Sequence, residues 1–498
     1  MMTHPCVLAI DQGTTNTKAL LLDGRGGVVA RASRRMNVSF PAPGWVEQDA
    51  EELWTAAVET VTACVGDAAR PIAAIGVTNQ RESVVVWDRA SGRPVGPCIV
   101  WQCRRTAPFC AGLRARGLDR AVQEKTGLAI DPLFSASKAR WLLNHIPDGR
   151  ARAADGELCI GTVDSWLLWN LTGGAVHACD LSNAARTQLL NLHSLSWDAE
   201  LLDLFGIPAA AMPRLGPSSG VFGATVPVGP LKGGIPIASL VGDSHAALFG
   251  HGAFAPGAVK ATYGTGTSLM TLLPSPTLSR AGLSTTVAWG LPDGTSYALE
   301  GNITVTGGAV DWLGQLLGHA NPAQAVADLA ATVPDSGGVH LVPALAGLGA
   351  PHWDADARGL VCGLTRGTTA AHLARAALDS IAFQVRDVFD AMRAEAPVPL
   401  PELLADGGAA GNDALMQFQA DVLGCPVARN RSTDLSACGA AWLAGLATGV
   451  WRNLDSLRQL PRAIDRFEPA IADAARARLY DGWKEAVART RSRRTGAA

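Results

Sequence analysis

The chain has 498 residues, of which 48% are hydrophobic and 17% are charged. This composition is typical of a globular protein, and the length exceeds what one simple core holds, so we expect two large lobes. The net charge of -2 gives no general attraction to nucleic acid or to an anionic membrane. No uncharged apolar run reaches membrane-spanning length. We therefore expect no nucleic-acid partner and no membrane insertion.

The first residues and the cysteines indicate in which compartment the protein is expected and whether it is expected to bind zinc. The sequence runs straight into an apolar, strand-like segment, without the basic segment, apolar core and cleavage site of a secretion signal. The ten cysteines contain no CxxC pair, and the close group Cys98, Cys103 and Cys110 has poor spacing for zinc. We interpret all ten as reduced, mostly buried thiols, and we expect a cytoplasmic protein.

Residues 7–22 contain two apolar runs joined by a turn rich in Gly and Thr, which predicts a hairpin. Asp11 falls where the first strand ends. Gly13 lets backbone amides approach a ligand closely, and Thr14 and Thr15 add hydroxyl groups. Successive backbone N–H groups in such a turn bind anions, and a nearby carboxylate can hold Mg²⁺. An ordinary hairpin with a polar tip is the alternative that this stretch leaves open.

A buried strand is predicted for residues 72–78, and Arg81 and Glu82 follow it. Ligands bind beyond the carboxyl ends of strands in open α/β sheets, so this pair is a candidate for binding hydroxyls as donor and acceptor. A surface ion pair is the alternative interpretation. Trp101 ends another predicted strand and can offer a flat apolar face to a carbon chain, unless it belongs to the core.

A further strand is predicted for residues 235–241, and Asp243 lies between it and a small-residue helix at 246–250. A carboxylate at a helix N-terminus is favoured in its ionised form. A plain helix-capping aspartate is the alternative.

The hairpin pattern returns about half a chain later. Strands are predicted for residues 258–263 and 268–273, and Gly264, Thr265 and Gly266 form the turn between them. This repetition indicates two related lobes that each offer a phosphate-facing turn across a cleft. The chain has no GxxxxGK[ST] or GxGxxG motif at these turns, which argues against a P-loop enzyme and a dinucleotide fold.

Further elements are predicted in the second lobe. They include a long helix at 370–393, a strand at 403–409 that ends in glycines, and a buried Gly/Ala-rich helix at 437–451. Glycines at a strand end let ligand parts lie against the backbone, although tight packing explains them equally well. The chain ends in a helix from residue 470 onward and a basic tail at 489–494.

Taken in order, these stretches resemble the FGGY carbohydrate kinase family, and most closely its glycerol kinases, over nearly the whole chain. The resemblance implies an α/β, two-lobed actin/hexokinase-like ATPase fold of duplicated ribonuclease H-like domains with a central cleft. It divides the chain into an N-terminal lobe, residues 1–248, and a C-terminal lobe, residues 249–498. The matching stretches are residues 11–18, 44–49, 78–82, 99–106, 161–166, 241–250, 262–266, 347–354, 406–409 and 438–445.

The resemblance also assigns roles to individual residues. Asp243 would be the catalytic base, and Asp11 would hold the Mg²⁺ that accompanies ATP. The chain would act as a homodimer on a small polyol or sugar. The polyol site would be lined by Arg81, Glu82, Trp101, Leu133, Asp243, Ser244 and Ser268. The nucleotide would be bound by Gly13, Thr14, Thr15, Lys18, Gly264, Thr265, Gly266, Gly308, Gly408 and Asn412.

Four of these positions depart from the pattern of glycerol kinases. Lys18 stands where they have Arg, which keeps the charge but loses the bidentate fork. Leu133 replaces a tyrosine, Ser268 a phenylalanine and Ser244 a glutamine, which predicts a wider and less apolar pocket. We expect ATP-dependent phosphorylation of a terminal hydroxyl of a small polyol, glycerol to glycerol 3-phosphate. A larger polyol or keto-sugar of four to six carbons is the alternative.

Overall fold

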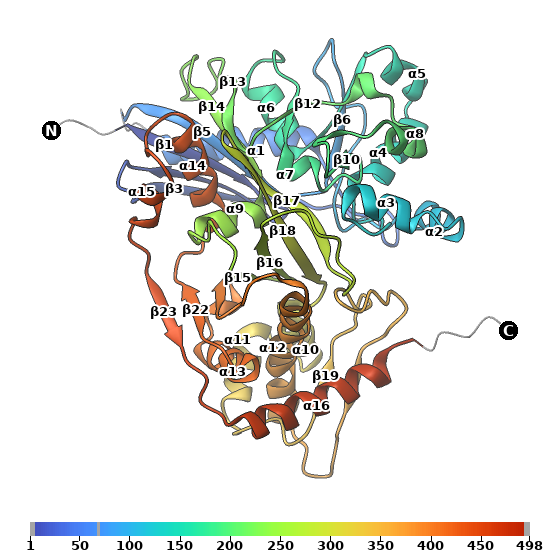
Figure 1. Ribbon diagram of the computed structural model, residues 1–498, viewed down its shortest axis with the longest axis vertical. Coiled ribbons are helices and arrows are strands. Elements are labelled where there is room, and N and C mark those ends of the chain that lie inside the picture. The colour runs from blue at the N-terminus through green and yellow to red at the C-terminus, as the bar shows by residue number, and fades with distance from the viewer. Residues whose placement is uncertain (1–4, 67–69, 493–498) are drawn as a thin grey trace.

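The computed structural model describes residues 5–66 and 70–492, which form two lobes stacked along the long axis (Figure 1). Blue to green segments build the upper, N-terminal lobe, and most yellow to red segments build the lower lobe. In the described residues no helix is long and apolar enough to cross a membrane.

The N-terminal lobe is organised around a six-stranded sheet with the strand order β13-β14-β5-β1-β2-β3. A second sheet of this lobe has the order β4-β7-β6-β8. The strands of these sheets are β1 (Cys6–Gln12), β2 (Asn16–Leu22), β3 (Val28–Arg35), β4 (Glu47–Gln48), β5 (Ile72–Asn79), β6 (Val84–Asp88), β7 (Cys98–Ile99), β8 (Leu158–Thr162), β13 (Ser219–Ala224) and β14 (Pro236–Gly242). Two short pairs are β9 (Ala178–Asp180) with β12 (Arg214–Gly216), and β10 (Leu190–Asn191) with β11 (Ser196–Trp197).

The C-terminal lobe is organised around a seven-stranded sheet with the order β17-β18-β16-β15-β21-β22-β23. Its β17 packs against α7 and β13 of the N-terminal lobe, so one edge of this sheet reaches across the lobe boundary. The strands are β15 (Val259–Tyr263), β16 (Thr267–Leu273), β17 (Ser284–Leu291), β18 (Gly294–Ile303), β21 (Leu403–Asp406), β22 (Val427–Asn430) and β23 (Ile464–Phe467), with a separate pair of β19 (His340–Val342) and β20 (Leu360–Cys362).

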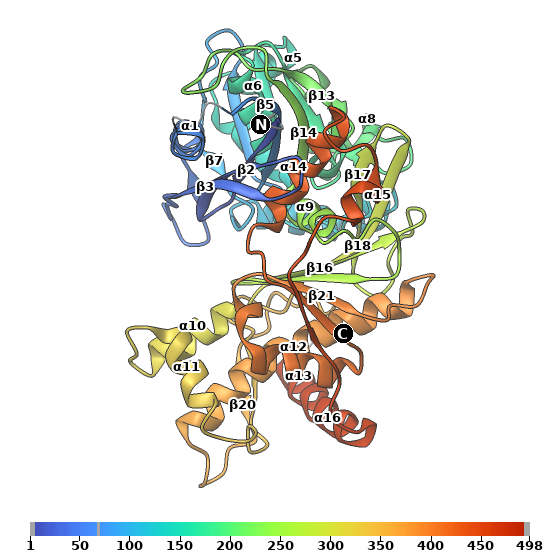
Figure 2. The same ribbon diagram turned by 90° about the vertical axis from the view of Figure 1, so that its left-hand side faces the viewer.

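Helices cover the two large sheets, and in the lower lobe α10 and α11 pack against α12, which also contacts α13 (Figure 2). The helices are α1 (Ala50–Val65), α2 (Ala107–Ala115), α3 (Asp119–Thr126), α4 (Ser135–His145), α5 (Gly149–Ala154), α6 (Val163–Leu171), α7 (Leu181–Ala184), α8 (Ala199–Phe205), α9 (Asp243–Gly250), α10 (Gly307–Leu316), α11 (Pro322–Ala330), α12 (Ala370–Glu395), α13 (Asp413–Leu423), α14 (Leu435–Ala447), α15 (Leu454–Arg458) and α16 (Asp473–Thr490).

The two sheets repeat one pairing scheme. Strand β1 is antiparallel to β2 and parallel to β5, and β15 is antiparallel to β16 and parallel to β21. Each Gly/Thr turn therefore lies at the tip of a hairpin whose first strand is central in its sheet. The apolar run of β1 is buried because a central strand is covered on both faces. The predicted two-lobed α/β fold with duplicated halves is confirmed.

Helix α14 crosses from the C-terminal half of the chain onto the N-terminal sheet, where it packs against β5 and α9. Three glycines permit this close approach. A Cβ atom on Gly439 would lie 1.9 Å from the Ala246 carbonyl oxygen, and one on Gly76 would lie 2.3 Å from that of Ala440. A Cβ on Gly250 would lie 2.4 Å from the Leu435 carbonyl oxygen. The predicted buried helix is present, but it packs against the sheet of the N-terminal lobe rather than that of the C-terminal lobe.

Candidate active site

Asp243 stands where β14 ends and α9 begins, at the boundary between the lobes. Its side chain is 40% exposed, and its Oδ1 lies 3.1 Å from the Arg81 Nε. The same oxygen accepts a hydrogen bond of 2.6 Å from the Ser244 N–H. Burial raises the pKa of Asp243, while Arg81 opposes that shift. The helix cap is Gly242, so the interpretation of Asp243 as a plain capping residue is wrong.

Arg81 and Glu82 are both buried, and neither is a partner of the other. Arg81 contacts Asp243 and also Glu300, whose Oε1 lies 2.7 Å from the Arg81 Nη1. Glu82 instead accepts a hydrogen bond of 2.7 Å from the Arg186 Nε. The alternative of a surface ion pair is therefore wrong, because these charges are held inside the protein by other partners.

Glu82 has a left-handed backbone conformation, with φ of 63°. Two donors from α4 hold its carbonyl oxygen, namely the Ser135 hydroxyl at 3.1 Å and the Lys138 ammonium at 3.4 Å. Lys138 also donates to the carbonyl of Leu133, so it ties that loop to the same turn. Burial lowers the pKa of Lys138 to about 8. A strained turn held by several groups is typical of a functional site.

Among the residues of this site that are absent from the sequence-based prediction are Glu300 and Arg186. Both side chains are fully buried, and the Arg186 Nη1 lies 2.7 Å from the Glu300 Oε2. Burial alone would raise the pKa of Glu300, but Arg186 and Arg81 hold it well below its usual range. The available signal was a lone glutamate in the otherwise uncharged run of residues 294–303.

The two serines at the departing positions form a chain of hydrogen bonds. The Ser244 hydroxyl donates to the Ser268 Oγ at 2.9 Å, and the Ser268 hydroxyl donates to the Glu300 Oε1 at 3.1 Å. At the other end, the Lys260 ammonium donates to the Ser244 Oγ at 3.1 Å. Lys260 is fully buried, and burial lowers its pKa. These hydroxyls are therefore engaged with charged groups.

Trp101 connects the predicted polyol site with the first Gly/Thr turn. Its indole Nε1 donates to the Thr14 Oγ1 at 2.9 Å, and the Thr14 hydroxyl donates to the Gln80 Oε1 at 3.1 Å. The indole is half-buried against the edge of an apolar cluster rather than inside it. Leu133 is also half-buried, in the loop before α4. The turn and the indole are thus held together by one hydroxyl.

The two Gly/Thr turns have exposed or half-buried tips. Gly13 donates its N–H to the Asn16 carbonyl at 3.0 Å, and Gly264 donates to the Gly266 carbonyl at 2.9 Å. The second turn is fixed to the start of α10, because the Gly308 N–H donates to the Thr265 carbonyl at 3.1 Å. A turn held this rigidly is preorganised for a ligand.

Asp11 is the next-to-last residue of β1, close to the first turn, and burial raises its pKa to about 7. Asp243 and Asp434 raise this pKa further, whereas Lys18 lowers it. Lys18 is itself paired with Asp434 at 3.0 Å, at the start of α14. A carboxylate whose surroundings disfavour its charge gains from a divalent cation beside it. The residues present therefore fit a Mg²⁺ ion at Asp11.

Two of the residues predicted to bind the nucleotide, Gly408 and Asn412, follow the end of β21. No other heavy atom lies within 4 Å of a Cβ built on Gly408, so the backbone there faces open space. Asn412 caps α13 by accepting a hydrogen bond of 3.0 Å from the Leu415 N–H. This arrangement leaves room for a flat group against the Gly408 backbone.

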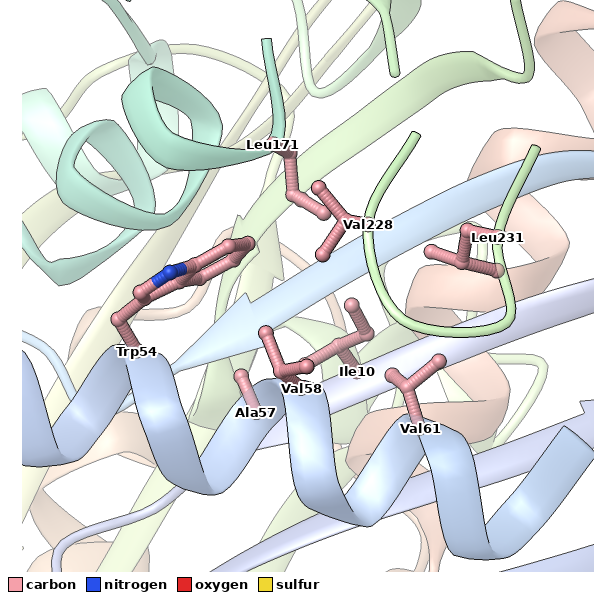
Figure 3. Close-up of a pocket in the computed structure, with 8 residues that line it drawn as sticks. All are labelled: Ile10, Trp54, Ala57, Val58, Val61, Leu171, Val228 and Leu231. Carbon is pink, nitrogen blue, oxygen red and sulfur yellow. The ribbon is translucent and has the colours of Figure 1, made fainter. Parts of the chain in front are cut away.

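A separate apolar gap lies in the N-terminal lobe between α1 and the turn at residues 228–231 (Figure 3). Its volume is about 10 Å³, which is room for one water-sized sphere. The lining is apolar except for the indole of Trp54, and the residues shown are Ile10, Trp54, Ala57, Val58, Val61, Leu171, Val228 and Leu231. A gap of this kind is a packing defect and offers no polar group to orient a substrate.

Two lobes with matching Gly/Thr turns and a carboxylate between them define an actin/hexokinase-like phosphotransferase. The N-terminal domain of the FGGY family of carbohydrate kinases matches residues 6–250, and its C-terminal domain matches residues 259–448. The chain belongs to the FGGY family of carbohydrate kinases, and the resemblance expected from the sequence is confirmed.

Individual relatives agree with this assignment. A glycerol kinase of Symbiobacterium thermophilum is 51% identical over 98% of this chain and 99% of its own length. Glycerol kinase 2 of Thermotoga maritima is 48% identical, over 97% and 98% of the two chains. The crystal structure of Plasmodium falciparum glycerol kinase with ADP superposes with a TM-score of 0.90 at 32% identity, covering 98% of each chain.

Proposed function

We propose that this chain transfers the γ-phosphoryl group of ATP to a terminal hydroxyl of glycerol, giving glycerol 3-phosphate and ADP. The observation that carries the proposal is the position of Asp243, at the start of α9 and paired with Arg81 between the two lobes. The similarity to glycerol kinases over nearly the whole chain supports the choice of substrate.

The chemistry needs positioning and charge stabilisation more than covalent catalysis. Asp243 accepts the proton of the attacking hydroxyl while that oxygen bonds to the γ-phosphorus and the bond to the ADP oxygen breaks. Arg81 and Glu82 orient the other hydroxyls, and Trp101 packs on the carbon chain. The backbone amides of the two Gly/Thr turns face the phosphate charge, and lobe closure excludes water.

Metal dependence gives a first prediction. We propose that Asp11 holds Mg²⁺, which would neutralise charge on the phosphates. Chelation of divalent cations is expected to abolish turnover, and added Mg²⁺ to restore it. The variant Asp11→Asn should need a much higher Mg²⁺ concentration for half-maximal rate, because a charged ligand is lost. A magnesium titration of both proteins by coupled ADP release measures this, and identical curves would contradict the role of Asp11.

Substrate range gives a second prediction. The serines at positions 244 and 268 are hydrogen-bonded to each other and to Glu300 and Lys260, so their hydroxyls are already engaged and less available to the extra hydroxyl groups of a longer chain. We therefore expect glycerol to give the highest kcat/KM in a panel of three- to six-carbon polyols and ketoses. If a four- to six-carbon substrate is preferred over glycerol, the result would favour the alternative of a kinase for a larger polyol or keto-sugar, which Leu133, Ser244 and Ser268 suggest.

The remaining assignments belong to the same proposal. We place the boundary between the N-terminal polyol lobe and the C-terminal nucleotide lobe at residues 248 and 249. Lys18, now paired with Asp434, would turn toward the phosphates when ATP binds. Gly308, Gly408 and Asn412 would line the adenosine site. We also propose a cytoplasmic homodimer, and light scattering of the purified protein tests its oligomeric state.

A further inference from the structure

Glu300 is a fully buried carboxylate that the proposed mechanism does not use. It lies on β18 of the C-terminal sheet, yet both of its charged partners, Arg81 and Arg186, come from the N-terminal lobe. Each of its two oxygens lies 2.7 Å from one guanidinium. Buried charges are expensive to desolvate, and apolar residues of similar volume often stabilise a fold as well or better. Stability is therefore a weak explanation for this group.

The three side chains Arg81, Glu300 and Arg186 form what we call the charge bridge. One end of the bridge is the Arg81 Nε at the base Asp243, and the other end is the Arg186 Nε at Glu82. Negative and positive groups thus alternate from the base to the glutamate that would bind the polyol. Glu300 is the central member, and it is the one that belongs to the other lobe's sheet.

The hydrogen-bonded serines join the charge bridge at the same carboxylate. Ser268 donates to the Glu300 Oε1, which is also the oxygen nearest to Arg81. The chain continues through Ser244, the residue after the base, to the ammonium of Lys260. Glu300 is therefore connected to the surroundings of Asp243 by two routes, one through Arg81 and one through the serines.

We propose that Glu300 is a positioning residue for the transfer, acting through Arg81 and Arg186; this inference rests on the proposed function. Its carboxylate holds the two guanidinium groups apart and in fixed orientation. Without that charge, Arg81 is free to turn toward the remaining carboxylates, Asp243 and Glu82. Asp243 and Glu82, the two carboxylates proposed to contact the polyol, then lose the orientation that the reaction needs.

The variant Glu300→Gln keeps the shape of the side chain and removes its charge. We expect kcat/KM for glycerol to fall about 100-fold, the order of loss caused by a small misplacement of reacting groups. The KM for glycerol should rise while the KM for ATP stays near that of the unmodified protein. The variant Arg186→Gln should show a similar fall in kcat/KM. The double variant should lose little more kcat/KM than the more damaged single variant, because the effects of coupled residues are not additive.

A matched control is Asp387→Asn, which neutralises a largely buried carboxylate of α12 that accepts hydrogen bonds from Tyr480 and Trp483. We expect this variant to lower the melting temperature without changing the KM for glycerol. If Glu300→Gln also lowers the melting temperature without changing the KM for glycerol, Glu300 has only a structural role and the inference is wrong. Failure of the unmodified protein to phosphorylate glycerol would instead contradict the proposed function.

A crystal structure of Glu300→Gln tests the inference independently of the substrate. The expected result is a reoriented Arg81 guanidinium with more than one contact to Asp243 or Glu82. Unchanged positions of Arg81 and Arg186 would overturn the positioning role, whatever polyol the protein phosphorylates.

Discussion

Replacement of Asp243 by asparagine is expected to lower kcat by about a thousandfold, since a positioned general base contributes on the order of 10² to 10⁴ in rate. The amide cannot accept the proton of the attacking hydroxyl at neutral pH. The KM for ATP should stay close to that of the unmodified protein, because the Gly/Thr turns and the Gly408 region remain intact. Steady-state kinetics with coupled ADP release measure both quantities.

The same variant should keep its fold. The Asp243 side chain is 40% exposed, and Arg81 keeps Glu300 as a partner, so a neutral amide of the same shape is tolerated at this position. Asp203→Asn, at an exposed carboxylate of α8, is the control and should leave the kinetics unchanged. Full activity of Asp243→Asn would remove the base from the mechanism.

The second large effect concerns the packing of α14. The variant Gly439→Ala is expected to lower the free energy of unfolding by about 3 kcal/mol, at the upper end of typical overpacking costs. Its Cβ would lie 1.9 Å from the carbonyl oxygen of Ala246, so α14 and α9 must separate. Because α9 begins with Asp243, we expect kcat to fall as well. Chemical denaturation and activity at 25 °C measure the two effects.

Gly112→Ala is the matched control for this experiment. Gly112 lies within α2, and apart from the backbone of that helix and the neighbouring residues, no heavy atom lies within 4 Å of a Cβ built there. Alanine is the better helix former, so we expect this variant to be unchanged or more stable by up to about 1 kcal/mol. A Gly439→Ala protein with the stability of the Gly112→Ala protein would show that the two helices do not need their close contact.

Much of the fold could be predicted from local pattern. The two Gly/Thr turns between apolar runs predict both hairpins, and their repetition predicts two related lobes. The Gly/Ala-rich run near residue 440 predicts a buried helix. Its position on the N-terminal sheet could not be predicted, because periodicity shows that a helix is buried without showing which element, here β5 and α9, lies against it.

The position of a candidate residue could be predicted where that residue follows a strand. Arg81, Glu82 and Asp243 lie at such ends, and the structure brings all three together with Glu300. Glu300 itself lies within a strand, and its two arginine partners are more than 100 residues away in the sequence. Whether a lone charge in a strand faces solvent or a buried arginine depends on tertiary contacts, which no local pattern contains.

The most direct test of the account is a crystal structure of the chain with glycerol, Mg²⁺ and a non-hydrolysable ATP analogue. The account predicts closed lobes, with an Asp243 oxygen about 3 Å from a terminal hydroxyl of glycerol and that hydroxyl in line with the γ-phosphorus. Glycerol bound away from Asp243, or a γ-phosphate directed away from that carboxylate, would contradict it.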